Sequence, residues 1–263
     1  MNDIHRIVEM LDSAATDASP VDQVTSRMPL TLEQAYAVQH RLVACRVQRG
    51  DTVSGVKLGF TSRAKAEQMG VSDVIIGSVT EGMCFANGSS VDPARFIHPR
   101  VEPEVAFRLD VDVDPGDPNA VPVVTQVAPA LEVIDSRYRN FSFTLEDVVA
   151  DNTSAAGYVL GPWISLEEVR ARRDLANLGV VLEIDGEIAE TGSTAAILGD
   201  PLRAVAAVKR MARAHGFALP AGIVILAGAA TAAAPLPVTP GSYVEATVEG
   251  FGRVSVSIGG DHG

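Results

Sequence analysis

Two glutamates separated by a single proline stand in the segment HPRVEPEVAF, residues 98–107. Successive residues of a strand alternate between its faces, so Glu102 and Glu104 share a face with Cα atoms about 7 Å apart. Two ionised carboxylates this close repel each other unless a cation compensates. A divalent cation such as Mg²⁺ suits them, because it prefers oxygen ligands and often takes only a few carboxylates with water and substrate. A solvated edge strand carrying two surface glutamates is the alternative interpretation.

A third carboxylate supports the metal interpretation. Glu132 lies in the segment PALEVIDSR, whose apolar pattern indicates a buried strand. A buried charge needs a partner or a metal. Three carboxylates on two neighbouring strands would suit one Mg²⁺ with coordination positions open for a ligand. Asp135 points to the opposite face if the strand stays extended, and we expect it to form a turn or cap contact with Arg137.

A lysine with small neighbours is the next candidate. In SGVKLGF, Lys57 shares a strand face with Gly55 and Gly59. Glycines remove side-chain bulk and permit close approach of a ligand or of another backbone. A lysine in such a slot could hold an anion or stabilise an enolate. An ordinary lysine with its stem on the apolar surface and its ammonium in water fits the pattern equally well.

Other polar side chains are candidates for substrate contacts. Arg100 lies on the glutamate face, where it would bind a substrate carboxylate through two parallel hydrogen bonds or support the acids. In the segment ADNTSAAG, Ser154 would donate a hydrogen bond to a ligand carboxylate. A helix cap or turn is the alternative for this whole segment.

Composition limits the class of protein. The chain has 263 residues, 47% of them hydrophobic, which is enough for a well-buried core. Its net charge of −12 disfavours nucleic acid and anionic membrane surfaces as partners. Cys45 and Cys84 lack zinc-ligand spacing, and we expect two buried free thiols. With no signal-peptide or membrane-spanning pattern, the chain is expected to be cytoplasmic.

Hydrophobic periodicity predicts two N-terminal helices, at residues 4–15 and 31–50, the second opened by a capping box of Thr31 and Gln34. They would form a helical appendage, residues 1–50, before a catalytic domain, residues 51–263. Strand patterns dominate that domain, with a hairpin turning at Asp185–Gly186. The expected strands are 52–60, 74–80, 101–113, 124–137, 179–193 (the hairpin), 222–228 and 242–258. The expected helices are 62–70, 165–178 and 200–216. Without regular βαβ alternation, the class is a β-rich α+β fold.

Taken together, several segments resemble a known family. SGVKLGFTSRAKAEQMGV, HPRVEPEVAF, APALEVIDSRYRNFSFTLEDVVADNTSAAGYVLG and LAGAATAA are similar, in this order, to the 2-oxopent-4-enoate hydratase and 4-oxalocrotonate decarboxylase family. The resemblance covers residues from about 30 to 257. It implies the mixed-sheet roll of the fumarylacetoacetate hydrolase C-terminal domain, with a helical N-terminal appendage.

The resemblance also implies roles for particular residues. The positions of the family's metal ligands are occupied here by Glu102, Glu104 and Glu132. Lys57 occupies the position of the active-site lysine, and Ser154, with Thr153 beside it, occupies the substrate-pocket position. The implied metal is Mg²⁺, with Mn²⁺ as the other choice.

The activity implied by the resemblance is decarboxylation of 4-oxalocrotonate (2-oxo-hex-3-enedioate) in meta-cleavage catabolism of aromatic compounds. The products are CO₂ and 2-hydroxypenta-2,4-dienoate. Mg²⁺ would act as Lewis acid and template, and Lys57 would stabilise the developing oxyanion. Because the dienol is unstable, a complex with a 2-oxopent-4-enoate hydratase is expected. The sequence does not give the oligomeric state and leaves room for a homo-oligomer.

Two alternatives to the decarboxylase remain. The family's hydratases carry an acid where Ile75 stands here, so a water-adding enzyme is disfavoured, although Asp73 could replace that acid. A non-catalytic subunit that keeps only the fold is the other alternative. The presence of all three glutamates and of Lys57 argues against it.

Overall fold

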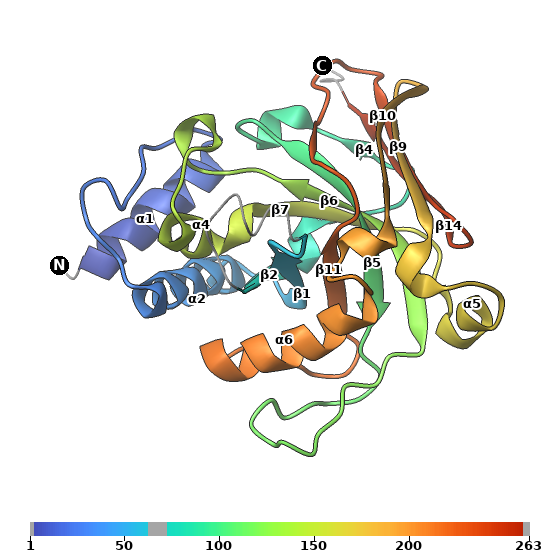
Figure 1. The fold of residues 1–263 in the computed structure, drawn as a ribbon. Helices are drawn as coiled ribbons and strands as arrows, with labels where there is room; N and C mark the ends of the chain where they lie inside the picture. The colour runs from blue at the N-terminus through green and yellow to red at the C-terminus, as the bar shows by residue number, and fades with distance from the viewer. Residues whose placement is uncertain (1–2, 63–72, 260–263) are drawn as a thin grey trace.

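The structure is a computed structural model that describes residues 3–62 and 73–259. Within these ranges the strands form two sheets (Figure 1). The larger sheet follows the path β2 (Ile75–Thr80), β1 (Val53–Gly59), β11 (Val224–Ala229), β5 (Arg100–Arg108), β6 (Gln126–Ile134), β7 (Ala155–Leu160) and β3 (Cys84–Phe85), with β12 (Ala234–Pro235) and β8 (Ile164–Ser165) beside it. The smaller sheet follows the path β10 (Glu187–Ser193), β9 (Gly179–Ile184), β13 (Tyr243–Val248), β14 (Gly252–Ile258) and β4 (Ser90–Val91).

The larger sheet is mixed, as predicted. β1 runs parallel to β11, whereas β11, β5, β6 and β7 are successively antiparallel. The sheet curls over on itself. Three strands separate β1 from β7, yet the hydroxyls of Ser54 on β1 and Tyr158 on β7 lie 2.9 Å apart. The predicted hairpin is also present, with positive φ at both Asp185 and Gly186, as a two-residue turn of this kind requires.

Both faces of β5 and β6 are buried. On one face, Val101 and Val133 pack against the smaller sheet. The other face lines the inside of the curled sheet, where alanines such as Ala106 and Ala130 leave room. Glu102 and Glu104 lie on this inner face and are only 6% and 1% exposed. The alternative of a solvated edge strand is therefore wrong.

Five α-helices are found in the described ranges: α1 (Asp3–Thr16), α2 (Leu32–Gln48), α4 (Leu145–Ala150), α5 (Leu166–Arg172) and α6 (Leu202–His215). The capping box of Thr31 and Gln34 opens α2 as predicted. Asp200 accepts a hydrogen bond at the start of α6, and Gly216 ends that helix with φ 78°. Most of the helix expected at 62–70 lies outside the described residues. No helix in the described ranges is long and apolar enough to cross a membrane.

The N-terminal helices share the main core. Ile7 and Leu11 of α1 and Val38 of α2 belong to the same apolar cluster as residues of β1 and β2. The buried Gln39 amide donates hydrogen bonds to the Ile76 carbonyl at 3.1 Å and to the Val149 carbonyl at 2.9 Å. A domain boundary at residue 50 stays a prediction.

Two smaller expectations were wrong. The strand expected at 101–113 ends at Arg108, because Asp110 onward leaves the sheet and turns at Asp114, whose carboxylate accepts from the Gly116 amide. The cysteines are free, but Cys45 is half-buried and Cys84 is exposed. Cys84 opens the short strand β3, whose alternation turns the next residue inward and Cys84 outward.

His215, the last residue of α6, gives a pH prediction. Its ring stacks on Tyr36 with centroids 3.7 Å apart. Burial lowers the pKa of His215, nearby His40 lowers it further, and Asp73 opposes both. The neutral ring therefore stabilises the fold above the unfolded pKa of about 6.5, and this stability is lost as the pH falls through the lowered pKa. From about pH 7.5 to 5.5, the thermal unfolding midpoint should fall more steeply in the wild type than in His215→Phe, which keeps the stack. Equal slopes would contradict this.

Candidate metal and substrate site

Strand register brings the three glutamates together. Glu102 and Glu132 are direct cross-strand partners on β5 and β6, and Glu104 lies two residues further along β5. Each offers a carboxylate oxygen, and the three oxygens all lie within 4.8 Å of one another. All three side chains point inside the curled sheet, among small residues. The geometry is that of a candidate site for one cation, as the sequence predicted.

Hydrogen bonding leaves part of this oxygen set unused. Glu104 Oε2 accepts from the Gly228 amide at 2.9 Å. Glu104 Oε1 and Glu132 Oε2 are buried and have no hydrogen-bond partner within the described part of the chain. Gly228 has φ 113°, and a Cβ there would lie 2.1 Å from Thr61 Oγ1, so this close approach requires glycine. Buried carboxylate oxygens without partners are costly, and a cation would satisfy them.

The electrostatics point the same way. Burial raises the pKa of Glu104 well above its usual value, and the charge of Glu132 raises it further while Lys57 opposes. Burial also raises the pKa of Glu132, again against the effect of Lys57. A divalent cation would favour the ionised carboxylates. The donors are oxygens alone, which fits a hard cation such as Mg²⁺.

Lys57 reaches this cluster across the curled sheet. Its Nζ lies 2.7 Å from Glu132 Oε1 and donates a hydrogen bond to the Thr153 carbonyl at 3.0 Å. Lys57 is 3% exposed, so the alternative of a surface lysine is wrong. The glycines beside it make room for other protein atoms and not for a ligand. A Cβ at Gly55 would lie 2.4 Å from the Val224 carbonyl oxygen, and one at Gly59 would meet the side chain of Ile75.

Thr153 and Ser154 lie in a short 3₁₀ turn, η4 (Asn152–Ser154), that follows α4. Both hydroxyls are buried and have no hydrogen-bond partner in the part of the chain that the structure describes. The protein therefore does not use them to hold the turn. They remain available to a ligand, and the carbonyl of Thr153 places this turn against Lys57.

Arg100 stands apart from this cluster. It opens β5, is exposed, and its guanidinium lies 4.8 Å from the centre of the Phe141 ring. Period two puts it on the same strand face as Glu102. The structure thus gathers the three glutamates, Lys57 and the η4 turn, and it leaves Arg100 at the end of the strand.

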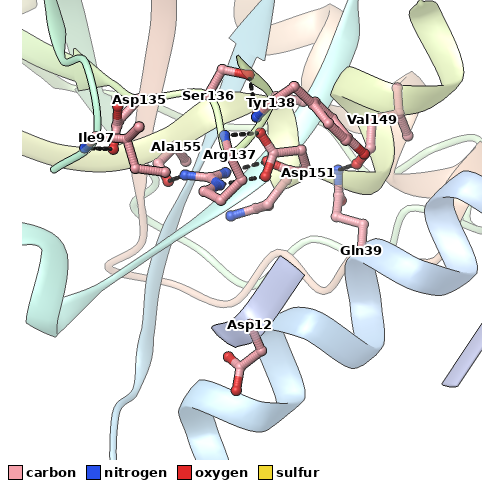
Figure 2. Close-up of polar contacts among 12 residues, drawn as sticks. Asp12, Gln39, Ile97, Asp135, Ser136, Arg137, Tyr138, Val149, Asp151 and Ala155 are labelled. Carbon is pink, nitrogen blue, oxygen red and sulfur yellow. Dashed lines mark hydrogen bonds and ion pairs between the residues drawn. The ribbon is translucent and has the colours of Figure 1, made fainter. Parts of the chain in front are cut away.

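The expected contact between Asp135 and Arg137 was wrong. Asp135 accepts hydrogen bonds from the backbone amides of Ile97 and His98, both at 2.8 Å. Arg137 instead forms a buried ion pair with Asp151, just before η4 (Figure 2). The extended strand ends at Ile134, so the alternation that the sequence suggested does not continue to Arg137. The sequence pattern around Asp151 indicates only a cap or turn.

This ion pair gives a stability prediction. Arg137 also donates to the Ala155 carbonyl at 3.1 Å, and burial raises the pKa of Asp151 to about 6 although Arg137 opposes the rise. Arg137→Leu would leave a carboxyl group buried without its cation, which typically costs about 3–5 kcal/mol. Urea unfolding at neutral pH should show this loss. Arg139→Leu, at an exposed pair with Asp22, should cost at most about 1 kcal/mol. Equal losses would contradict the prediction.

Comparisons with known proteins agree with this fold. The fumarylacetoacetate (FAA) hydrolase C-terminal family matches residues 83–258. A 4-oxalocrotonate decarboxylase from a Pseudomonas species is 46% identical over 98% of this chain and 99% of its own. A 2-keto-4-pentenoate hydratase from Paraburkholderia xenovorans is 34% identical over 94% of this chain and 91% of its own. The solved 4-oxalocrotonate decarboxylase of Pseudomonas putida G7, complexed with magnesium and adipate, superposes with a TM-score of 0.88 at 36% identity, covering 97% of each chain.

The chain therefore belongs to the fumarylacetoacetate hydrolase family, in the group that contains the 4-oxalocrotonate decarboxylases and the 2-keto-4-pentenoate hydratases. The family resemblance and the predicted C-terminal-domain roll are confirmed.

Proposed function

We propose that this protein is a Mg²⁺-dependent decarboxylase that converts 4-oxalocrotonate to 2-hydroxypenta-2,4-dienoate and CO₂. The observation that carries the proposal is the buried carboxylate cluster paired with Lys57, in a chain 46% identical to a protein of that name over nearly its full length. A solved relative that holds magnesium and a dicarboxylate supports the choice of metal and substrate class. Mn²⁺ is the alternative metal. A cytoplasmic location and a place in aromatic catabolism stay predictions.

Each residue has a distinct role in this proposal. Glu102, Glu104 and Glu132 hold the metal, which when bound supplies Lewis acidity at the 2-oxo acid end of the substrate. The hydroxyl of Ser154, with Thr153 beside it, donates to the neighbouring carboxylate. As the bond to the distal carboxylate breaks, the electron pair moves through the conjugated chain to the keto oxygen. The Lys57 ammonium stabilises that oxygen's growing negative charge. Protonation then gives the dienol.

Hydratase activity is the second candidate, because relatives 32–34% identical carry hydratase names. It would need an acid near the lysine strand. Ile75 stands at the expected position and is buried. Asp73, the substitute considered above, forms an ion pair with Arg210 of α6 and accepts from the Val74 amide. Asp73 is thus engaged on the α6 side, which favours the decarboxylase.

The test is an ultraviolet assay of 4-oxalocrotonate with CO₂ detection, in Mg²⁺ and then in EDTA. The proposal expects metal-dependent CO₂ release that Glu102→Gln abolishes. Hydration of 2-hydroxypentadienoate to 4-hydroxy-2-oxopentanoate without CO₂ release would identify a hydratase. An intact metal site without turnover of either substrate would favour a non-catalytic subunit.

Arg100 is proposed to hold the distal carboxylate of the substrate. That carboxylate loses its charge in the reaction, so the contact stabilises the ground state and not the transition state. Arg100→Gln should raise KM by about 10–100-fold, the loss of one charge-assisted hydrogen bond, without lowering kcat. A fall in kcat at unchanged KM would instead mean that Arg100 supports the glutamates. Arg108→Gln is the matched control and should leave KM unchanged. Arg108 lies on the same strand, but its guanidinium carbon lies 4.4 Å from the centre of the Trp163 ring.

A complex with a hydratase follows from the instability of the dienol product. Relatives of both activities occur in this group, so the two partners would share one fold. Gel filtration of the chain with a 2-oxopent-4-enoate hydratase from the same organism should show one larger species. Separate elution would contradict the complex, and elution of the chain alone would establish whether it is a homo-oligomer.

A further inference from the structure

The η4 turn has an unusual backbone. Asn152, Thr153 and Ser154 have φ values of 48°, 54° and 58°, three consecutive non-glycine residues in the left-handed region. Asparagine tolerates this region better than most residues, whereas a β-branched threonine strongly disfavours it. Such a run persists only where surrounding contacts hold it in place.

Asn152 supplies a pair of those contacts. Its Oδ1 accepts from the Ser78 amide at 2.9 Å, and its Nδ2 donates to the Ser78 carbonyl at 2.8 Å. Ser78 lies on β2, the edge strand at one end of the larger sheet's path. β1 pairs with one side of β2, and no strand of that path pairs with the other side, where Asn152 lies. The amide thus takes the place of a neighbouring strand and satisfies both backbone groups of Ser78. We refer to this pair of bonds as the amide clamp.

Packing brings the turn close to β2. A Cβ at Gly77 would lie 2.2 Å from Thr153 Oγ1, so only glycine at this position lets the turn approach. The hydroxyls of Thr153 and Ser154 make no hydrogen bonds within the described residues and do not secure the turn. The side-chain bonds between the turn and β2 are therefore those of the amide clamp.

The turn places one functional atom. The Thr153 carbonyl accepts the hydrogen bond from Lys57 Nζ at 3.0 Å, and among the described residues the ammonium also contacts Glu132 Oε1 at 2.7 Å. Glu132 is also a candidate metal ligand, so its charge is shared when a cation binds. The Thr153 carbonyl is then the contact that fixes the ammonium independently of the metal.

We propose that Asn152 is a positioning residue: its amide clamp on Ser78 fixes the Thr153 carbonyl and, through it, the Lys57 ammonium. The kinetic consequence rests on the proposed function. The placement of Lys57 does not, and it can be measured without substrate or metal.

The first readout is NMR of lysine side chains. The chain contains three lysines, Lys57, Lys65 and Lys209, so selective ¹³Cε labelling gives three signals, and Lys57→Met assigns one of them. In the wild type, the fixed Lys57 should show two unequal Hε shifts. In Asn152→Ala these shifts should merge and move toward the position of a free lysine.

The second readout is turnover. Asn152→Ala should lower kcat by about 10–100-fold, the effect of misplacing a reacting group by about 1 Å, and change KM less than about twofold. Asn152→Gly keeps access to the left-handed region but lacks the amide, so it should behave like Asn152→Ala. The matched control is Asp185→Ala, which also removes a left-handed polar residue with two hydrogen bonds, to Tyr243 N and Ser242 Oγ, in the distant β9–β10 hairpin. It should change neither readout.

Three results would overturn the inference. They are an unchanged Lys57 signal in Asn152→Ala, full recovery of both readouts in Asn152→Gly, and an equal change in Asp185→Ala. Absence of CO₂ release by the wild type would count against the proposed function alone. The lysine signals would then still decide the role of Asn152.

Discussion

Glu104→Gln should lower metal-dependent CO₂ release by at least about 10³-fold. Glutamine has nearly the same shape and can still accept from the Gly228 amide, so the backbone contact survives. What disappears is one negative charge from a site where three carboxylate oxygens lie within 4.8 Å of one another. A bound metal typically contributes several kcal/mol of transition-state stabilisation, which corresponds to that factor.

The same variant should lose the stabilisation that Mg²⁺ gives the wild type in thermal unfolding, since a ligand that binds only the folded chain raises the midpoint. In the absence of metal, Glu104→Gln should be more stable than the wild type. It removes a buried carboxyl group whose ionisation opposes folding, because burial and Glu132 raise its pKa. Glu187→Gln, on the exposed strand β10, is the control and should match the wild type in both respects. Undiminished turnover in Glu104→Gln would remove Glu104 from the metal site.

Lys57→Met should lower kcat by about 10²–10³-fold, the usual effect of removing one donor to a developing oxyanion. Methionine keeps most of the buried stem, so the loss of the ammonium is the main change. Mg²⁺ affinity should be kept or increased, because Glu132 loses the cation that now lies 2.7 Å away.

This separation of effects distinguishes a catalytic lysine from one that only balances charge. If Lys57 only neutralised Glu132, tight metal binding in Lys57→Met would come with nearly normal turnover. Lys209→Met is the control, since the Lys209 ammonium donates to the backbone carbonyls of Pro118 and Ala120 and not to a carboxylate of the site. It should turn over at the wild-type rate. Isothermal titration with Mg²⁺ and steady-state kinetics measure the two quantities.

The local parts of the fold and site were predictable from sequence. Period-two alternation put Glu102 and Glu104 on one face, and the hairpin turn and the helix caps followed from residue chemistry. The roles of these residues came from the family resemblance. What alternation could not show is that the second face of β5 is also buried, because burial there depends on the sheet curling over it.

Partners that are distant in the sequence were also not predicted, because they meet only in the folded sheet. Nearness in the sequence predicts Asp135 as the partner of Arg137, whereas the observed partner is Asp151, which directly follows α4. Asn152 was read as part of a cap or turn, because its bonds to Ser78 exist only once β2 and the η4 turn meet. The glycines beside Lys57 suggested room for a ligand, but Gly55 lies against strand β11 and Gly59 lies against Ile75.

The contact between Lys57 and Glu132 has a consequence for how the protein folds. β1 and β6 are not neighbours in the sheet, and the ion pair forms only after β11 and β5 have been inserted between them and the sheet has curled. Contacts between segments so distant in the chain form late and slowly, because the loops must close first. A chain in which only β5 and β6 have paired would hold the three glutamates together but lack the Lys57 ammonium beside them. During refolding, CO₂ release should therefore return with the last kinetic phase, so turnover would report the fraction of native molecules.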